Sequence, residues 1–338
     1  MTCPSSAWRR VFAGACLAGM VLLQASSIFA ETGTLLPSEK VGVAVPYLPE
    51  SIDPLAQNDP VNRIVLSNIA YGLTRNGRDE TVELEAADAL REMENGKRWQ
   101  LRLRSDARYA NLSPVLPTDV VDSFKLLKQL AGSRPGVPAT GLAELTVSLA
   151  DTPAGQPQEI VFELPQADPY FLSTLANVPI VNAELMTRFG DRFGKGTNVA
   201  FLGPYQLREH RKNTSILLEA VPGFYRPGLP RARFVDFRVF DTAAAALSAL
   251  RTGAVDIIAI PTPALVAEAK DDTTLQILQS PLAGPVEGGG RAWGLPRPRW
   301  SDAGSDDELL THSIILRKTL RIDDSLLARF DLSGTFLP

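Results

Sequence analysis

Cysteine is almost absent from this chain, and its scarcity limits the chemistry open to the protein. The 338 residues include two cysteines, Cys3 and Cys16, and both fall within the first thirty residues. If that segment is removed, the remaining chain has no thiol, and it can form neither a disulfide nor a thiolate zinc site. A cysteine nucleophile and redox chemistry are therefore excluded for the mature protein.

Histidine and the common catalytic motifs are also scarce. The two histidines, His210 and His312, are flanked by cationic or polar residues, which favours solvated side chains over a general base or a metal ligand. There is no Gly-x-Ser-x-Gly elbow and no His-Glu-x-x-His pair. The stretch Gly190–Thr197 resembles a phosphate loop, but its spacing is wrong. Asp241 follows a predicted strand and is better explained as a helix cap. We expect no enzyme, no cofactor and no metal.

An excess of positive charge is missing as well. Lysine and arginine total 34 and aspartate and glutamate total 38, for a net charge of -4. A protein that binds a phosphate backbone without sequence preference needs a basic surface. We therefore expect no nucleic acid among its partners.

The first thirty residues have the pattern of an export signal. Arg9 and Arg10 precede the uncharged apolar run Val11–Leu23, and small and polar residues lead to Ala30. The apolar run is short for a membrane anchor, which needs roughly 20 such residues. Lipidation of Cys16 is the less favoured alternative, because no leucine-like residue precedes it. We predict a cleaved signal peptide over residues 1–30 and a periplasmic location.

Apolar spacing along the rest of the chain predicts a mixed order of strands and helices, which is typical of α/β proteins. The expected strands are Val41–Val45, Lys97–Arg104, Leu145–Leu149, Glu159–Leu164, Tyr205–Arg208, Ser215–Ala220, Arg233–Phe240 and Val255–Ile260. The expected helices are Asn62–Leu73 closed by Gly72, Glu85–Arg91, one capped by Thr118, Pro169–Ala176, Ala243–Thr252 stopped by Gly253, and Glu308–Phe330. The glycine-rich and proline-rich stretch after Pro281 predicts a loop or a crossing between lobes.

One segment has a specific pattern. Residues Asn198–Leu207 contain Gly203-Pro204-Tyr205, and they resemble the Asn-Pro-Val-Gly-Thr-Gly-Pro-Tyr segment of the oligopeptide-binding class of ABC-importer binding proteins, solute-binding family 5. Phe201 and Leu202 replace the earlier Gly-Thr of that segment, and we expect these large apolar residues to pack in the core. Further likenesses appear in the family's order, at Asp53-Pro54, Tyr71-Gly72-Leu73, Glu85-Ala86-Ala87, Gly223-Phe224-Tyr225-Arg226 and Leu250–Ile257.

The resemblance implies an α/β fold of the periplasmic binding protein-like class II architecture. It implies lobe I from residues 31–52 and 165–280, and a small extra domain over residues 53–164. Residues 281–338 would then be the crossing between lobes and the start of a second lobe that is largely missing. The positions Gly203, Pro204, Tyr205, Gly253 and Asp256 match family motifs that we interpret as structural.

The resemblance also implies a function. A family member closes its lobes on a peptide or similar small molecule and delivers it to an ABC permease in the inner membrane. The expected ligand-cleft residues are Tyr47, in the loop after the first strand, with Trp293, Arg297 and Trp300. Because the second lobe is short, we expect impaired transport. An exported sensor or interaction protein, or a non-functional remnant that keeps the first lobe, remains as the alternative.

Overall fold

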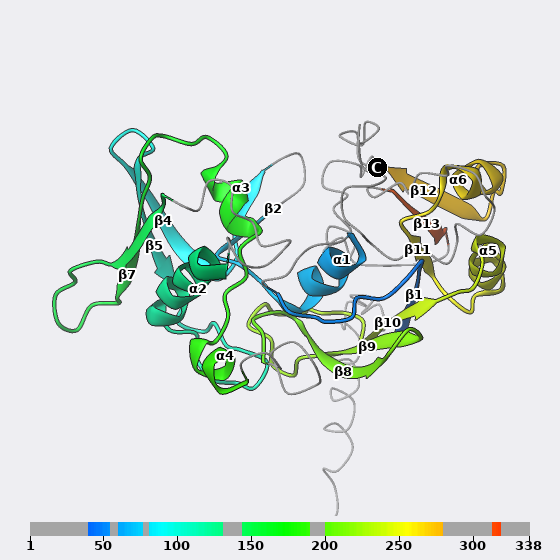
Figure 1. Ribbon diagram of the computed structural model, residues 1–338, viewed down its shortest axis with the longest axis horizontal. Coiled ribbons are helices and arrows are strands. Elements are labelled where there is room, and N and C mark those ends of the chain that lie inside the picture. The colour runs from blue at the N-terminus through cyan, green and yellow to red at the C-terminus, as the bar shows by residue number, and fades with distance from the viewer. Residues whose placement is uncertain are drawn as a thin grey trace, which may run out of the picture. The chain divides into compact units, whose positions relative to one another are not determined.

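The computed structural model describes residues 40–54, 60–76, 81–130, 144–189, 200–279 and 313–318. The described residues form two larger sheets, one of seven strands and one of four, and a small two-stranded sheet (Figure 1). Helices pack against the two larger sheets. The mixed α/β class predicted from the sequence is therefore present.

The seven-stranded sheet has a parallel centre with antiparallel neighbours. Its order is β12 (Leu275–Gln279), β13 (Ser313–Arg317), β11 (Ile257–Ala259), β1 (Lys40–Val45), β10 (Phe234–Val239), β9 (Ser215–Ala220) and β8 (Tyr205–Arg211). Strand β1 is parallel to both β10 and β11, with Val45 beside Val239 and Ala44 beside Ile258. The remaining pairs in this sheet are antiparallel.

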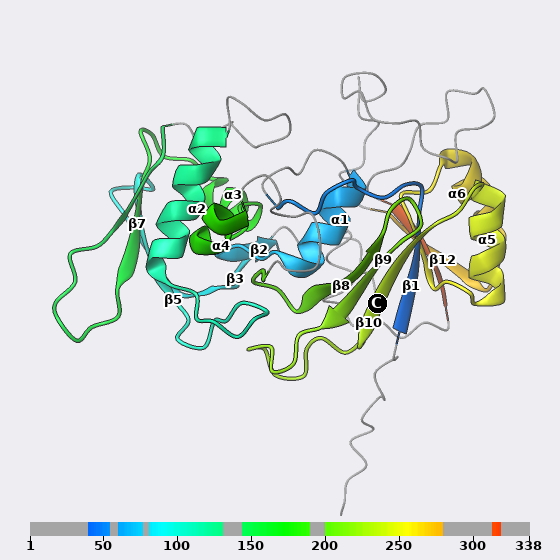
Figure 2. The same cartoon turned by 60° about the horizontal axis from the view of Figure 1, so that its bottom comes forward.

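Alternate residues of the central strands face two different hydrophobic clusters. Val43 and Ile257 join the larger cluster, to which α1 (Pro60–Ile69) contributes its apolar face. Ala44 and Ile258 join a smaller cluster with α5 (Ala243–Thr252) and α6 (Pro263–Lys270). Figure 2 shows α5 and α6 beside β1 and β12. The centre of this sheet is thus covered on both faces, as expected for parallel strands.

The four-stranded sheet is antiparallel, in the order β4 (Ala87–Met93), β5 (Arg98–Leu103), β7 (Glu159–Glu163) and β6 (Thr146–Leu149). Helix α2 (Pro117–Leu130) packs on this sheet. Helix α3 (Phe171–Ala176) lies mainly against β2 (Thr74–Asn76) and reaches the sheet through the ring of Phe171. The ring centroids of Phe124 and Phe162 lie 5.2 Å apart, and those of Phe162 and Phe171 lie 5.6 Å apart. The short strands β2 and β3 (Val82–Leu84) and helix α4 (Ala183–Phe189) complete the described elements.

Most of the predicted strands are present with small shifts in their bounds. The hairpin predicted from residues 145–164 is the β6–β7 pair, in which Val147 lies opposite Phe162. The helix predicted over Ala243–Thr252 has those bounds and ends at Gly253, whose φ of 79° is left-handed. A glycine adopts this conformation without the steric cost that a side chain would add.

Two of the predicted helices in the first hundred residues differ from the structure: one is a strand, and the other is shorter than predicted. The predicted helix Glu85–Arg91 is instead strand β4, because its backbone pairs with β5 and tertiary pairing overrides local preference. The helix predicted to reach Leu73 ends at Ile69. Gly72 lies beyond that end, where an added Cβ would be 2.5 Å from the Leu175 carbonyl oxygen. Gly72 is therefore required by the close approach of another segment.

The predicted cap of α2 is also wrong. Thr118 lies inside the first turn, since the helix begins at Pro117. The side chain of Asp119 accepts a 2.9 Å hydrogen bond from the Leu116 backbone N–H. This is the reverse half of a capping box. Burial raises the pKa of the Asp119 carboxyl group above its usual value.

The predicted helix Glu308–Phe330 is contradicted where the structure describes it, because Ser313–Arg317 is strand β13. Ile314 and Leu316 join the larger cluster, whereas Ile315 joins the smaller one. A segment buried on both faces has no alternating pattern to distinguish it from a helix. Within the described ranges, none of the helices is long and apolar enough to cross a membrane.

Candidate functional site

Three parallel strands end at the same edge of the seven-stranded sheet. These are β1, β10 and β11, whose last residues are Val45, Val239 and Ala259. We call the residues that follow them, Pro46–Tyr47, Phe240–Asp241 and Ile260–Thr262, the carboxyl edge. In open α/β sheets, ligands bind outside the carboxyl ends of the strands. The carboxyl edge is therefore the candidate site.

Tyr47 lies in the loop after β1, as the sequence places it. It is half-buried and packs against the larger cluster, while Leu48 and Ile52 on the same loop are buried. The Asp53 backbone N–H donates a 3.2 Å hydrogen bond to the Ser51 hydroxyl oxygen. Strand β1 thus holds the loop before Tyr47, and the buried Leu48 and Ile52 hold it after Tyr47. The Tyr47 side chain has an aromatic ring and a hydroxyl group, and these are the kinds of group that we expect in a ligand contact.

Two helices begin at the carboxyl edge. The Thr242 hydroxyl oxygen accepts a 3.1 Å hydrogen bond from the Ala245 N–H, which caps α5, and Thr262 caps α6 in the same way through the Leu265 N–H at 3.2 Å. The prediction that Asp241 caps α5 is therefore wrong by one residue. Asp241 is exposed at this edge. Both helices direct backbone N–H groups and the positive ends of their dipoles toward the edge.

The backbone conformation of Ile260 was not expected, because the sequence places this residue at the end of a buried strand. Ile260 follows β11 with a φ of 57° and is buried. A left-handed conformation is a genuine outlier for a β-branched residue and persists where the surrounding structure imposes it. It turns the chain from β11 into the Pro261–Thr262 segment. The one sequence signal here is that a buried apolar run meets two prolines, Pro261 and Pro263.

The Gly203-Pro204-Tyr205 motif holds three segments together. An added Cβ at Gly203 would lie 2.5 Å from the carbonyl carbon of Ile69, at the end of α1. The Pro204 carbonyl accepts a 2.8 Å hydrogen bond from the Val221 N–H, and the Tyr205 hydroxyl donates one of 3.1 Å to the Ala232 carbonyl. These contacts fix the start of β8 against α1 and against both ends of the β9–β10 connection.

The two apolar residues before this motif are buried, as expected. Phe201 and Leu202 have exposed fractions of 2% and 0%. Their carbonyl groups accept hydrogen bonds from the Ala110 and Tyr71 N–H groups. Both residues therefore take part in core packing at the start of β8.

Asp256 ties β1 to its neighbours. Its carboxylate accepts a 2.9 Å hydrogen bond from the Gly42 N–H, and its own N–H donates one of 2.8 Å to the Gly42 carbonyl. The Arg317 guanidinium lies 3.8 Å from the same carboxylate and packs over Gly253. Gly253 and Asp256 thus position β1, β11 and β13 without lying in the carboxyl edge.

A buried carboxylate was missed by the sequence analysis. Glu85 is 2% exposed, and its side chain accepts hydrogen bonds from the Tyr225 hydroxyl at 2.6 Å and from Arg226 at 2.9 Å. Arg75 lies 3.1 Å away as a further ion-pair partner. Burial and the Glu85 charge raise the pKa of Tyr225 well above its usual value. This cluster links the β3–β4 turn to the β9–β10 connection and serves the fold.

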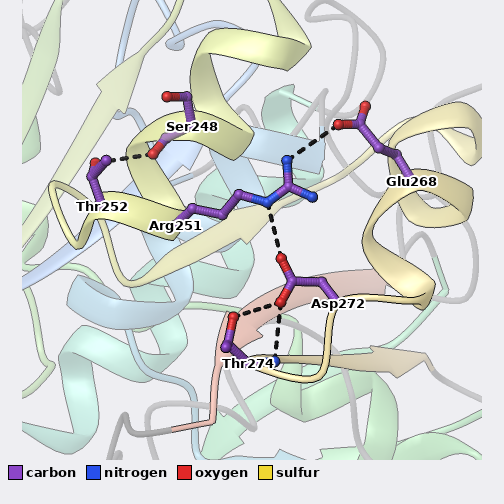
Figure 3. A network of polar contacts seen from close by, with 6 residues as sticks. All are labelled: Ser248, Arg251, Thr252, Glu268, Asp272 and Thr274. Carbon is purple, nitrogen blue, oxygen red and sulfur yellow. Dashed lines mark hydrogen bonds and ion pairs between the residues drawn. The ribbon is translucent and has the colours of Figure 1, made fainter.

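A second polar network is exposed and lies at the other end of α5. Arg251 contacts Glu268 and Asp272, and Asp272 also accepts hydrogen bonds from the hydroxyl and backbone N–H of Thr274 (Figure 3). The Thr274 hydroxyl and the Arg251 guanidinium lower the pKa of Asp272 to about 2. Since α5 begins at the carboxyl edge, this network is not part of the candidate site.

Several predicted residues lie outside the described residues. These are the cleft candidates Trp293, Arg297 and Trp300, the histidine His312 and the signal segment 1–30. His210 is half-buried on β8, where burial lowers its pKa. Among the residues that the structure describes, no cluster of histidine, cysteine, aspartate and glutamate could hold a metal ion.

Comparison with known proteins finds similarity to bacterial solute-binding proteins. A family model described as bacterial extracellular solute-binding proteins, family 5, matches residues 81–290. The dipeptide-binding protein of Lactococcus lactis is 20% identical over 267 residues, which is 74% of this chain and 47% of that protein. The chain therefore spans about half the length of this relative.

Solved structures show the same fold. The binding protein AgaA of A. tumefaciens in complex with agropinic acid has a TM-score of 0.63 at 18% identity, over 71% of this chain and 48% of that chain. Listeria monocytogenes OppA bound to peptide has a TM-score of 0.60 at 17% identity, over 72% of this chain and 50% of that chain. The mixed α/β fold thus matches about half of each structure.

The family match covers more than half of the chain and includes the Gly203-Pro204-Tyr205 motif, the buried segment before it and the α5–β11 unit. The family is one of solute-binding proteins and not of enzymes, as the sequence predicts. This chain belongs to family 5 of the bacterial extracellular solute-binding proteins.

Proposed function

We propose that the protein is the exported substrate-binding component of an ABC importer and binds a peptide or similar small solute at the carboxyl edge. The observation that supports this most directly is the convergence of three parallel strands, with Tyr47 in an anchored loop at their ends. The relatives are named for binding dipeptides, peptides and agropinic acid. The shared chemistry is a small polar solute that carries a charged group.

The domain organisation is part of the same proposal. Residues 31–52 and 165–280 form the first lobe, and residues 53–164 form the extra domain. The strands support this division, because the four-stranded sheet lies within residues 53–164 and β1 and β8–β12 of the seven-stranded sheet come from the first-lobe ranges. The helices cross the proposed boundary, since α1 contacts β8 and α3 contacts β2, and β13 adds residues 313–317 to the first-lobe sheet. A delivery partner in the inner membrane follows from the family. Its test is association of the chain with the permease of its own gene cluster.

A second candidate function is that of an exported sensor or interaction protein that uses the first lobe. The observation that favours it is coverage, since the chain matches about half of its relatives' lengths. Such a protein would need ligand binding at the carboxyl edge but no permease. Ligand binding without permease association would distinguish it from a transport component.

Two variants test the site directly. We expect Tyr47→Ala to weaken binding of di- to octapeptides, measured by ligand-detected NMR at millimolar peptide. The matched control is Tyr170→Ala, because Tyr170 is 74% exposed and precedes α3, and it is not one of the carboxyl-edge residues. Equal binding by the two variants, with both chains folded by circular dichroism, would argue against this site.

Export is tested separately. Expression in a Gram-negative host should release a mature protein with its N-terminus near Glu31, because Arg9, Arg10 and the apolar run after them have the pattern of an export signal. Mass spectrometry of the periplasmic fraction measures that terminus. Recovery of the intact chain from the cytoplasm would refute export.

A further inference from the structure

Strand β13 has an unusual place in the seven-stranded sheet. Strands β11 and β12 are joined directly through α6, yet they do not pair with each other. Strand β13 lies between them and is antiparallel to both, with Ile315 opposite Ile258 on one side and Ile277 on the other. In the described residues, β12 is held in the sheet through β13. We call the space between β11 and β12 the strand slot.

The strand slot requires a segment that is apolar on both faces. Ile314 and Leu316 pack into the larger hydrophobic cluster, and Ile315 packs into the smaller cluster of α5 and α6. Their exposed fractions are 1%, 4% and 0%. An empty slot would therefore expose both clusters and leave the backbone groups of β11 and β12 unpaired along two edges.

The end of β13 fixes its register. The Arg317 N–H donates a 3.3 Å hydrogen bond to the Asp256 carbonyl, and the Lys318 N–H donates one of 2.9 Å to the Thr274 carbonyl. The Arg317 side chain also approaches the Asp256 carboxylate. These contacts with Asp256 and Thr274 form in one register only. If β13 slipped by one residue, each of its side chains would point to the opposite face of the sheet, and Arg317 would lose its contact with Asp256.

The segment that fills the slot is joined to β12 by a long connection. Residues 280–312 separate the two strands in the sequence. A connection of this length can span at most roughly 110 Å when fully extended. That length permits β13 to enter the slot of its own chain or of an adjacent copy.

We propose that the strand slot is a strand-acceptor site and that residues 313–317 of a second copy of this chain can fill it. The contacts that β13 makes with β11, β12 and α5 would be the same whether the strand comes from the same chain or from another. Closure within one chain is intramolecular and does not depend on the protein concentration, so we expect the monomer to prevail in dilute solution. Exchange is expected when the chain refolds at high concentration.

Cross-linking tests the proposal in full-length chains whose Cys3 and Cys16 are replaced by serine. One chain carries Thr274→Cys and the other carries Lys318→Cys, since these exposed residues meet across β12 and β13. After refolding together at high concentration and treatment with a short bis-maleimide, we expect a covalent heterodimer. The matched control replaces Thr274→Cys by Arg208→Cys, an exposed position on β8 at the opposite edge of the same sheet, and should give several-fold less heterodimer.

Three further measurements decide the outcome. A chain with both Thr274→Cys and Lys318→Cys should cross-link internally, and a synthetic peptide of residues 313–318 should lower the heterodimer yield. Gln276→Cys with Lys318→Cys repeats the test without altering Thr274, because Gln276 lies opposite Leu316, diagonal to Lys318. Internal cross-linking with a heterodimer yield no higher than the control would overturn the proposal. Failure of the internal cross-link would overturn the register on which it rests.

Discussion

At the scale of single residues, Gly203 shows how a short motif can be fixed by packing alone. Its Cα lies so close to the end of α1 that an added Cβ would be 2.5 Å and 2.9 Å from the carbonyl carbon and the Cα of Ile69. Both are backbone atoms, which cannot rotate away as a side chain could. The motif therefore serves the junction of α1 and β8 and is not part of the carboxyl edge.

Replacing this glycine should destabilise the protein strongly. We expect Gly203→Ala to lower the free energy of unfolding by about 3 kcal/mol, because overpacking against rigid backbone forces segments apart. Gly155→Ala is the control, since Gly155 has a φ of 88° but nothing within 4 Å of an added Cβ, and it should cost about 1 kcal/mol. Urea unfolding measures both. Equal losses would mean that the contact with Ile69 relaxes at little cost.

Leu202 provides a second prediction at this scale. Its side chain is fully buried, so Leu202→Ala should leave a cavity and lower the free energy of unfolding by about 2–5 kcal/mol. The melting temperature should fall while peptide binding by the folded fraction stays unchanged. A variant with unaltered stability and weaker binding would instead make Leu202 a ligand contact.

Residue roles that depend on neighbours distant in sequence were not predictable. The burial of Phe201 and Leu202 follows from size and apolar character, and the sequence predicts it. Thr242 and not Asp241 caps α5 because the helix begins at Ala243, and the sequence does not place that first residue to within one position. Glu85 acquires its role because Tyr225 and Arg226 come to it from more than a hundred residues away. No local pattern carries that information.

At the scale of elements, the polar network that joins α5, α6 and β12 has a definite pH dependence. The folded-state pKa of Asp272 is lowered to about 2 from its usual 3.8 by the Thr274 hydroxyl and by Arg251. A group with a lowered pKa contributes stability above its unfolded-state pKa, and that contribution is lost as the pH falls through the folded-state value. The window therefore lies between about pH 4 and pH 2.

We expect Asp272→Asn to be less stable than the unmodified chain at pH 7, by a small amount because the site is exposed. The difference should close as the pH falls from about 4 toward 2, since the unmodified Asp272 then becomes protonated. Urea unfolding at several pH values measures it. Asp271→Asn is the control, because Asp271 takes no part in the contacts of Figure 3. A stability difference independent of pH would mean that Arg251 and Thr274 do not act on the carboxylate.

Elements with strong local signals were predictable, and elements defined by their partners were not. The α5 helix, with its alanine-rich run and its terminal glycine, matches its predicted bounds. Strand β4 was taken for a helix because its residues favour helix locally, and pairing with β5 decides otherwise. Strand β13 was also taken for a helix, because both of its faces are buried by distant clusters.

At the scale of the whole molecule, family membership and the mixed α/β class were predictable, because the motif residues occur in the family's order along the chain. Within the candidate site, Tyr47 was predicted at the end of β1, whereas the strained Ile260 and the cap Thr262 were not. Their roles depend on three strands ending together. That convergence is a property of the sheet and is not visible in any single segment.

Ligand affinity is the property that depends most on the whole molecule. In a two-lobed binding protein, affinity comes from enclosing the ligand on both sides, which removes water and gives each main-chain donor and acceptor a partner. The described carboxyl edge provides groups from one sheet, and the chain matches about half the length of its relatives. A peptide on such a surface keeps many of its groups solvated, while the cost of ordering it remains.

We therefore expect this chain by itself to bind peptides with a dissociation constant weaker than about 100 μM. Calorimetry against a mixed di- to octapeptide library measures it, with the dipeptide-binding protein of Lactococcus lactis as the reference under the same conditions. Chromatography with light scattering must accompany the titration, because a strand-exchanged dimer would place two carboxyl edges in one particle and could raise the apparent affinity by multivalency. A monomer that binds at micromolar concentration or tighter would contradict the expectation, since one carboxyl edge would then suffice to satisfy the ligand.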